Sequence, residues 1–465
     1  MLTVYHISGI CLTLLLITGV GIFSLRQVKS AADFAVGGRK IGATLVAGTI
    51  IGTLVGGSST VGTAQLAYNY GFSAWWFTLG SGFSCLFLGL VLARPLREAN
   101  VQTVPQFLGR VYGPAAAPLA GAFTSVGIFI NVIAQMLAAI ALITTIAGVS
   151  PFTAALIAAG LIIVYVIFGG VWGTGLVGTA KTLLLYFSLL VIGILAYGMV
   201  GGMAGLRAVF PPHPWLSMFG RGVAKDLASG FSLLVGVIST QTYLQAIFSG
   251  RDVAASRIGA VISGLLIPPM GLAGTFVGLY MKMHFPAISP AEALPMFIIR
   301  YLNPWLGGIT LATLLVSTIG TGAGLTLGVS TMLSQDFFKR IIRPQATDRQ
   351  VLLASRVLIV AVAGATLFFV TGNLNSLILK WSFLSMGLRG ATVCLPLLAA
   401  VFARQRVAPK AGTAAIVLAP LASLLWAFLV PEGTDPLYIG MGVSFACLLL
   451  SPLLGRKDLT QMKAG

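Results

Sequence analysis

The stretch LVGGSSTVGTAQLAYNYG, from Leu54 to Gly71, combines an apolar composition with residues that loosen a helix. It lies in an apolar run near residues 42–70, and its middle is a glycine pair followed by hydroxyl side chains. Glycine weakens helices, and an unpaired backbone group in lipid is costly. Two interpretations remain open. The helix is broken at the membrane centre to bind an ion and a solute, or it is a glycine-rich helix packed closely against its neighbours.

The whole chain has the composition of a polytopic membrane protein. Of its 465 residues, 57% are hydrophobic and only 8% are charged, and the mean hydropathy is +0.99. A soluble protein carries roughly a quarter charged residues. Apolar stretches predict thirteen membrane spans, near residues 4–25, 42–70, 72–93, 115–147, 151–168, 175–198, 227–248, 258–281, 306–333, 357–371, 375–403, 411–430 and 436–454.

The net charge of +18 follows the predicted topology. Twenty lysines and arginines fall in the loops on one side of these spans and five in the loops on the other. The positive-inside rule therefore predicts an outside N-terminus and a cytoplasmic C-terminus in a cell (inner) membrane. We interpret the excess as topology and attraction to membrane lipids, with no nucleic acid as partner. Three basic residues, Lys181, Lys380 and Arg389, fall inside the spans.

A weak internal echo suggests two related halves. LVGGSST at 54–60 is matched by LVGVIST at 234–240, and each opens a set of five spans. Interrupted helices in corresponding positions are typical of inverted-repeat transporters. The predicted organisation is an extra helix and loop at 1–41, repeats at 42–198 and 227–403 around a loop at 199–226, and two final helices with a short tail at 404–465. No soluble domain or cluster of acidic, histidine and cysteine residues is present to make an enzyme.

Six motifs follow one another between about residues 30 and 415. They are ADFAVGGRKIG (32–42), AYNYG (67–71), RPLREANVQTVPQFLGRVYG (94–113), FSGRDVAASR (248–257), LATLLVSTIGTGAGLTLGVSTMLSQDFFKR (311–340) and WSFLSMGLRGATVCLPLLAAVFARQRVAPKAG (381–412). In this order and spacing they resemble the sodium/solute symporter family, which includes sodium-coupled sugar, proline, pantothenate and choline carriers. The resemblance implies an all-α membrane protein with a five-plus-five inverted repeat.

The resemblance also implies one sodium site between the broken helix and the eighth core helix. The matching positions are the carbonyls of Gly52, Val55 and Leu314 and the hydroxyls of Ser317 and Thr318. Unwound carbonyls and hydroxyls suit sodium, a hard cation, without burying a net charge. The alternative for the two hydroxyls is hydrogen bonding to carbonyls one turn earlier in their own helix.

Two departures from the family pattern bear on the coupling ion. Family members with a second sodium have an aspartate at the position of Gly178. They also have further hydroxyls on the eighth core helix, where this chain has Gly320 followed by Thr321. We therefore predict no second sodium. One turn later stands Lys181. In proton-coupled relatives of this fold a lysine on the same helix replaces sodium, and an intramembrane lysine is a functional candidate. We favour the alternative, in which Lys181 reaches cytoplasmic water along its own alkyl chain.

The predicted solute pocket adjoins the broken helix. Its candidate residues are Gly56, Gly57, Ser58, Ser59, Thr78, Gln135, Gln241 and Tyr243. Free N–H groups at Gly56 and Gly57 would suit a carboxylate. The choline branch, similar around GTAQLAY, has an aromatic residue where this chain has Leu54, which puts choline in doubt.

These features predict a sodium-coupled symporter for a small organic solute, with a carboxylate or amino acid favoured. Proton coupling through Lys181 and a transporter-like sensor module are the two alternatives.

Overall fold

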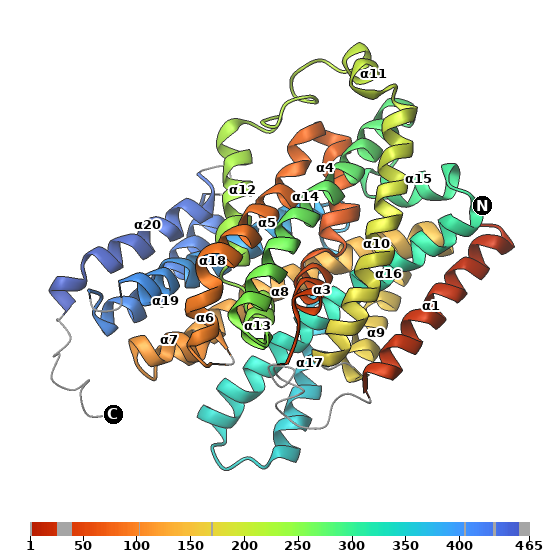
Figure 1. Cartoon of the computed structure of the whole chain (residues 1–465). Helices are drawn as coiled ribbons and strands as arrows, with labels where there is room; N and C mark the ends of the chain where they lie inside the picture. Colours follow the sequence, from red (N-terminus) through yellow and green to blue (C-terminus); the bar gives the residue numbers. More distant parts are fainter. Residues whose placement is uncertain are drawn as a thin grey trace.

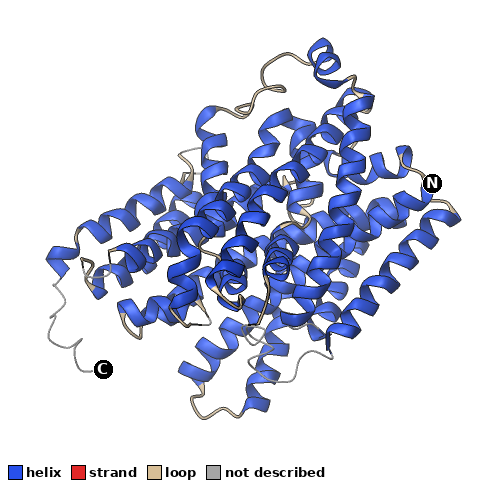
Figure 2. Ribbon diagram, in the orientation of Figure 1, coloured by secondary structure: helices blue, strands red, loops and turns tan. Residues whose placement is uncertain are grey.

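The chain is almost entirely helical in the computed structural model, which describes residues 2–25, 40–101, 103–168, 171–403, 406–430 and 434–454. Within these ranges there is no β-strand, and the only β contact is an isolated parallel bridge between Ile41 and Gly250 (Figure 2). Of the first family-like motif, at 32–42, residues 32–39 lie outside the described residues.

The helices form one bundle, with α3, α8 and α16 near its centre and α1 and α20 at opposite sides (Figure 1). Their bounds are α1 (Val4–Leu25), α3 (Ala43–Leu54), α4 (Thr63–Tyr70), α5 (Trp76–Phe87), α6 (Ala93–Glu98), α7 (Val104–Tyr112), α8 (Ala116–Ala147), α9 (Pro151–Phe168), α10 (Val171–Met199), α11 (Gly202–Val209), α12 (Val223–Val237), α13 (Gln241–Ser249), α14 (Val253–His284), α15 (Ala293–Tyr301), α16 (Pro304–Met332), α17 (Asp348–Thr371), α18 (Ile378–Phe402), α19 (Pro409–Leu429) and α20 (Pro436–Leu449). Tighter or wider helical turns at η2 (Ser58–Gly62), η3 (Gly71–Trp75), η4 (Leu88–Leu92), η5 (Pro290–Glu292), η6 (Leu333–Ile342) and η7 (Ser451–Leu454) join or extend them.

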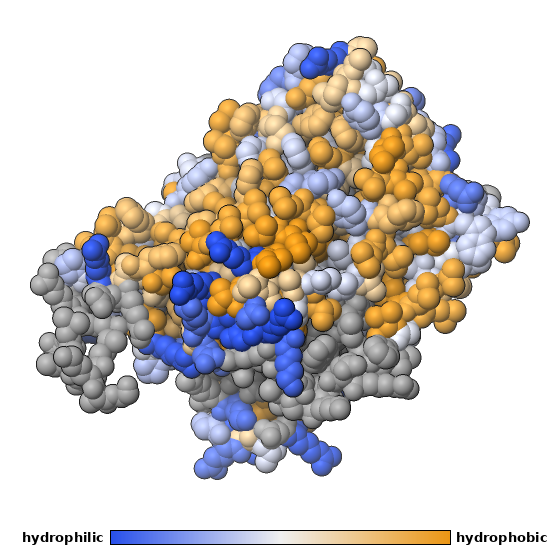
Figure 3. Space-filling model, viewed as in Figure 1, coloured by the Kyte–Doolittle hydropathy of each residue, from blue (hydrophilic) through white to orange (hydrophobic). Residues whose placement is uncertain are grey.

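A membrane protein is confirmed by the apolar helices. Within the described residues, eight helices are long and apolar enough to cross a membrane, or up to nine if one bent pair is counted as a span. Four shorter apolar helices accompany them. Large apolar side chains face outward across the middle of the bundle, and hydrophilic ones gather towards its ends (Figure 3). The count of thirteen crossings stays a prediction.

Two helices are interrupted, at the two positions that the sequence echo indicates. Helix α3 ends at Leu54, Val55 is extended, and the wide turn η2 leads into α4. Helices α12 and α13 meet at 43° across residues 238–240. Away from the breaks, the two interrupted segments are also joined, because Arg251 N–H donates to the carbonyl of Ile41 at 2.9 Å. The residue that precedes α3 is therefore tied to the loop that follows α13.

The loop between α11 and α12 folds over the junction of α4 and η3. Phe72 N–H donates to the carbonyl of Trp215 at 2.9 Å, and the indole of Trp76 donates to that of Met218 at 2.7 Å. Gly71 has a φ of +62°, and a Cβ there would strike the Trp215 carbonyl. This loop therefore forms a lid over one end of the bundle, below α11 in Figure 1.

Candidate functional site

The break after α3 is a place of close approach between four helices. A Cβ at Gly56 would stand 2.6 Å from Oε1 of Gln135 on α8 and 2.8 Å from Oγ1 of Thr321 on α16. A Cβ at Gly57 would strike Ala138, also on α8. Both interpretations of the glycine pair therefore apply. The helix is broken at Gly56 and Gly57, and the backbone there packs directly against α8 and α16.

The five predicted sodium ligands lie at this break. Ser317 on α16 donates a hydrogen bond from Oγ to the carbonyl of Val55 at 2.9 Å, which links α16 to the extended residue. Thr318 Oγ1 donates to the carbonyl of Leu314 at 2.8 Å, the local bonding considered as its alternative role. Both hydroxyls are fully buried. Carbonyl and hydroxyl oxygens lie beside the break without a carboxylate among them, and such oxygens are the ligands that a hard cation prefers.

The expectation that Lys181 reaches cytoplasmic water is wrong. Its side chain is only 4% exposed, and Nζ donates to the carbonyl of Gly52 at 2.5 Å. The same nitrogen lies 3.2 Å from the carbonyl of Ser317 and 3.4 Å from Oγ1 of Thr321. Oxygen acceptors inside the membrane therefore satisfy the amine without contact with water. Two of the contacted residues, Gly52 and Ser317, belong to the predicted sodium set.

Close packing between α10 and α3 explains how the lysine reaches this position. A Cβ at Gly52 would stand 2.8 Å from Cα of Gly178, and a Cβ at Gly178 would stand 3.0 Å from the carbonyl of Gly48. The position where some family members carry an aspartate is thus a backbone contact here. No acidic residue occurs on α10 or on α1, α3, α14 and α16, the long helices that pack against it. The amine is held by neutral oxygens alone.

Part of the predicted solute set is brought together beside the break. Gly57 N–H donates to Oε1 of Gln135 at 2.9 Å, and Nε2 of Gln135 donates to Oγ of Ser58 at 3.0 Å. Ser58 in turn lies 2.6 Å from Oγ of Ser382 on α18. Ser59 donates a hydrogen bond from Oγ to the carbonyl of Leu54 at 3.1 Å. The N–H of Gly57, expected to be free for a carboxylate, is therefore already bonded to an amide.

Two predicted solute residues lie elsewhere. Thr78 faces α14, where a Cβ on Gly271 would strike its hydroxyl. Gln241 accepts a hydrogen bond from Val104 N–H at 2.8 Å and so faces α7. The assignment of Gln241 rested on a matching position in an apolar helix, where a shift of one residue turns a side chain by about 100°. Tyr243 is buried beside the guanidinium of Arg389.

Four polar residues of this region escaped the sequence analysis as site residues. Asn131 accepts from Gln135 Nε2 at 3.5 Å and from Ser382 Oγ at 3.4 Å. Ser382, Ser385 and Arg389 follow one another at helical spacing on α18 and face α8. The sequence feature that could have identified them is a stripe of polar residues at helical spacing on each of the otherwise apolar helices α8 and α18. On α8, Asn131 stands one turn before Gln135.

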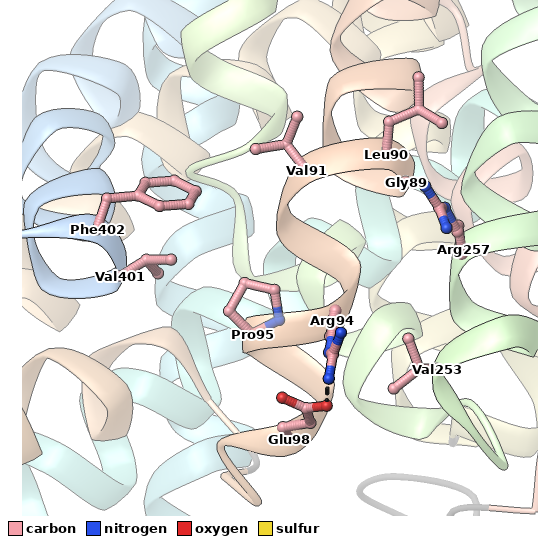
Figure 4. A pocket seen from close by; sticks show the side chains of 10 residues that line it. All are labelled: Gly89, Leu90, Val91, Arg94, Pro95, Glu98, Val253, Arg257, Val401 and Phe402. Atoms are coloured by element: carbon pink, nitrogen blue, oxygen red, sulfur yellow. Dashed lines mark hydrogen bonds and ion pairs between the residues drawn. The ribbon is translucent and has the colours of Figure 1, made fainter.

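A separate surface pocket is lined by other residues. It has a volume of about 450 Å³ and is lined by residues of η4, α6, α14 and α18, including Arg94, Glu98, Arg257 and Phe402 (Figure 4). Arg94 and Glu98, one turn apart on α6, form an exposed ion pair of 2.9 Å at its edge. The pocket contains none of the predicted sodium or solute residues.

Known proteins share this fold. The chain aligns over 98% of both lengths with a Na⁺-coupled sialic acid symporter in a substrate-bound outward-open state, at a TM-score of 0.75 and 14% identity. A nucleobase-cation-symport-1 family transporter aligns over 92% of this chain and 95% of its own at a TM-score of 0.61 and 11% identity. The expected inverted-repeat transporter fold is confirmed.

Sequence relatives point the same way. The sodium/proline symporter of Haemophilus influenzae is 23% identical over 90% of this chain and 87% of its own. The human high affinity choline transporter 1 is 22% identical over 76% of this chain and 66% of its own. The profile of the sodium:solute symporter family matches residues 34–417. The protein is therefore a sodium-coupled transporter of a small solute, not an enzyme, and it belongs to the sodium:solute symporter family.

Proposed function

We propose that this transporter carries a small carboxylate or amino acid together with a single sodium ion. The ion would be bound by the carbonyls of Gly52, Val55 and Leu314 and the hydroxyls of Ser317 and Thr318. The observation that carries the proposal is the contact of 2.9 Å between Ser317 and the extended Val55 carbonyl. It joins the broken helix to α16, so an ion there is sensitive to the separation of the two helices.

The solute class is supported by the polar groups around the break and by the relatives. Gly57, Ser58 and Gln135 form a buried hydrogen-bonded cluster beside the break, in which Gln135 accepts the N–H of Gly57 and donates to Ser58. Relatives named for proline and sialic acid carry substrates with a carboxylate. Choline has none, and Leu54 offers no aromatic face for its ammonium.

The distribution of charge supports a location in a cell (inner) membrane, with the N-terminus outside and the C-terminus in the cytoplasm. The lid over α4 and η3 then faces outward, and the link between Ile41 and Arg251 faces the cytoplasm. We assign the two repeats to residues 42–198 and 227–403, with the lid in the loop between them. Each repeat then begins with one of the two interrupted helices.

A second candidate is proton coupling, and the contact of Lys181 with Gly52 supports it. A protonated amine and a sodium ion cannot both occupy the space next to one carbonyl, since like charges repel at that distance. Either sodium displaces the ammonium during transport, or the ammonium takes the role of the ion. The two cases differ in what drives uptake.

Purified protein in proteoliposomes separates these cases. With radiolabelled L-proline or N-acetylneuraminate as probes, an inward sodium gradient should drive uptake and a potassium gradient should not. Sodium should also raise the melting temperature of the detergent-solubilised protein, because a ligand that binds only the folded state stabilises it. Uptake driven by a proton gradient without sodium would favour the second candidate, and binding of choline in preference to every acid would refute the solute class.

A further inference from the structure

Arg389 is a fully buried cation whose hydrogen-bond partners are all neutral. It lies near the middle of α18 and is 0% exposed. Its Nε donates to the carbonyl of Ser385 at 3.1 Å, Nη1 to Oγ1 of Thr240 at 2.8 Å, and Nη2 to Oγ of Ser385 at 2.9 Å. The sulfur of Met386 and the hydroxyl of Tyr243 complete its surroundings.

No carboxylate on the neighbouring helices faces this guanidinium. The helical elements packed against α18 are α4, α7, α8, α12, α19, α20 and the turn η2. Of these, only α12 carries an acidic residue, Asp226 in its first turn, and Asp226 is paired with Arg221 at 2.5 Å. Asp435, which caps the start of α20, also interacts with Arg221. Both acids lie at the lid end and already have a cationic partner.

A buried cation without a counter-ion is unfavourable unless something compensates its charge. Lys181, also buried and bonded to neutral oxygens, adds a second basic group to the same bundle. The described membrane interior therefore has an excess of basic groups over acidic ones. An anion that enters the bundle removes this imbalance, whereas a neutral or cationic solute leaves it unchanged or increases it.

The guanidinium is held in a fixed position at the second helix break. Thr240, the last residue before α13, donates its hydroxyl proton to the carbonyl of Gly236 at 2.6 Å, so its oxygen is turned as an acceptor towards Arg389. Ser385 is oriented in the same way by the carbonyl of Gly127 at 2.5 Å. Pre-oriented donors are favourable for binding a planar carboxylate in a bidentate manner.

A chain of hydrogen bonds starts at the first helix break and ends one turn of α18 away from Ser385 and Arg389. Along α8 and α18 it runs from Gly57 through Gln135 and Asn131 to Ser382, and one turn further on α18 lie Ser385 and Arg389. The N–H of Gly57, the anion donor expected from sequence, is occupied by Gln135. Arg389 is then the cationic group of this polar stripe.

We propose that Arg389 binds the carboxylate of the transported solute and so determines selectivity for anions. The proposal rests on the proposed solute class and names the residue that would recognise it. The carboxylate replaces the hydroxyl oxygens of Thr240 and Ser385 as acceptor of the guanidinium N–H groups, and Tyr243 adds a donor next to it. Since Thr240 stands at the break between α12 and α13, binding of the carboxylate acts directly on the second interrupted helix.

The test compares acids with their amides on the full-length protein. The probes are L-proline and L-prolinamide, propionate and propionamide, and N-acetylneuraminate and its amide, each followed by thermal shift with sodium present. In the wild-type protein at least one acid should bind well and its amide poorly. In Arg389→Gln the affinity for that acid should fall about a hundredfold, as expected for loss of a charge-assisted pair, while the amide changes little. Lys380→Gln, an exposed cation on the same helix, is the matched control and should behave as wild type.

Stabilisation by sodium alone shows whether Arg389→Gln is folded, because the sodium residues are on other helices. If that variant does not fold, Arg389→Lys keeps the charge but loses the bidentate geometry, so acid affinity should fall about tenfold or more. Unchanged preference for acid over amide in Arg389→Gln, or unchanged acid affinity in Arg389→Lys, overturns the role of Arg389 alone. A wild-type protein that binds only neutral or cationic probes overturns both this role and the proposed solute class.

Discussion

The ammonium nitrogen of Lys181 lies 2.5 Å from the carbonyl oxygen of Gly52, an atom of the predicted sodium site. The carbonyl of Ser317, whose hydroxyl belongs to the same site, lies 3.2 Å from that nitrogen. Two cations so close to the same oxygens compete, since their repulsion is strong in a membrane interior of low dielectric constant. A sodium ion bound at the predicted site and the protonated lysine would therefore be alternative occupants of one place, and this competition can be measured.

Replacing Lys181 by glutamine should strengthen sodium binding. The neutral amide removes the competing charge, so the sodium concentration for half-maximal thermal stabilisation should fall about tenfold or more, equivalent to about 1.4 kcal/mol. In the wild-type protein, acid favours the protonated amine, so sodium affinity should decrease from pH 8 to pH 6, and this dependence should vanish in Lys181→Gln. Equal sodium affinity of both proteins at every pH would contradict the competition. Loss of proton-driven uptake in the variant would identify the lysine as the coupling group.

Removing the hydroxyl of Ser317 should weaken sodium binding and loosen the contact between α16 and the break. We expect Ser317→Ala to raise the half-maximal sodium concentration about tenfold, because one buried oxygen ligand and its bond to Val55 are lost. Thr318→Ala should act in the same direction. Thr313→Ala is the control, because Thr313 is equally buried on α16 but bonds only to Ile309 of its own helix. Sodium dependence that is the same in all three variants would place the ion elsewhere.

The sequence predicted the fold better than it predicted the individual contacts. Each interrupted helix follows from local composition: Gly56 and Gly57 break the first, and the echo at 234–240 locates the second. Ser317 contacts Val55, a pair that the resemblance to the family assigns to one sodium site, and that site stays a prediction. Contacts such as Lys181 with Gly52 depend on how closely two helices approach. The distance between α3 and α10 depends on Gly48, Gly52 and Gly178 together. Gly52 and Gly178 are 126 positions apart in the sequence, so no local sequence pattern predicts their contact.

The close packing of α10 on α3 should make Gly178 intolerant of any side chain. A Cβ there would stand 3.0 Å from the carbonyl of Gly48, and overpacking of this kind costs about 1–3 kcal/mol. Gly178→Ala should therefore lower the melting temperature and also move the amine of Lys181 away from Gly52. Gly198→Ala, on the same helix but with open space around the new methyl group, should leave stability nearly unchanged. Equal melting temperatures for the two variants would show that the two helices are not in such close contact.

At the end of the bundle beneath the lid, the side chain of Gln65 joins α4 to the start of α18. On α4, Gln65 accepts a hydrogen bond through Oε1 from the N–H of Ile378 at 2.8 Å and donates through Nε2 to the carbonyl of Ser376 at 3.3 Å. Ile378 is the first residue of α18, and its N–H has no partner inside the helix. The side chain of Gln65 therefore holds the start of α18 against α4, below the lid. We expect opening of the transporter on this side to break both bonds.

Gln65→Ala should raise the hydrogen-exchange rate of the Ile378 amide about tenfold or more, since the loss of buried hydrogen bonds costs about 1–3 kcal/mol. Amides in the middle of α8, far from this contact, should exchange as in the wild type. Asn69→Ala is the matched control, because Asn69 lies one turn further along α4 and is half-buried. Hydrogen exchange read by mass spectrometry on peptides that span 374–380 separates the variants. If Asn69→Ala accelerates exchange there as much as Gln65→Ala does, the effect comes from a general loosening of α4, and the two bonds of Gln65 do not hold this side closed.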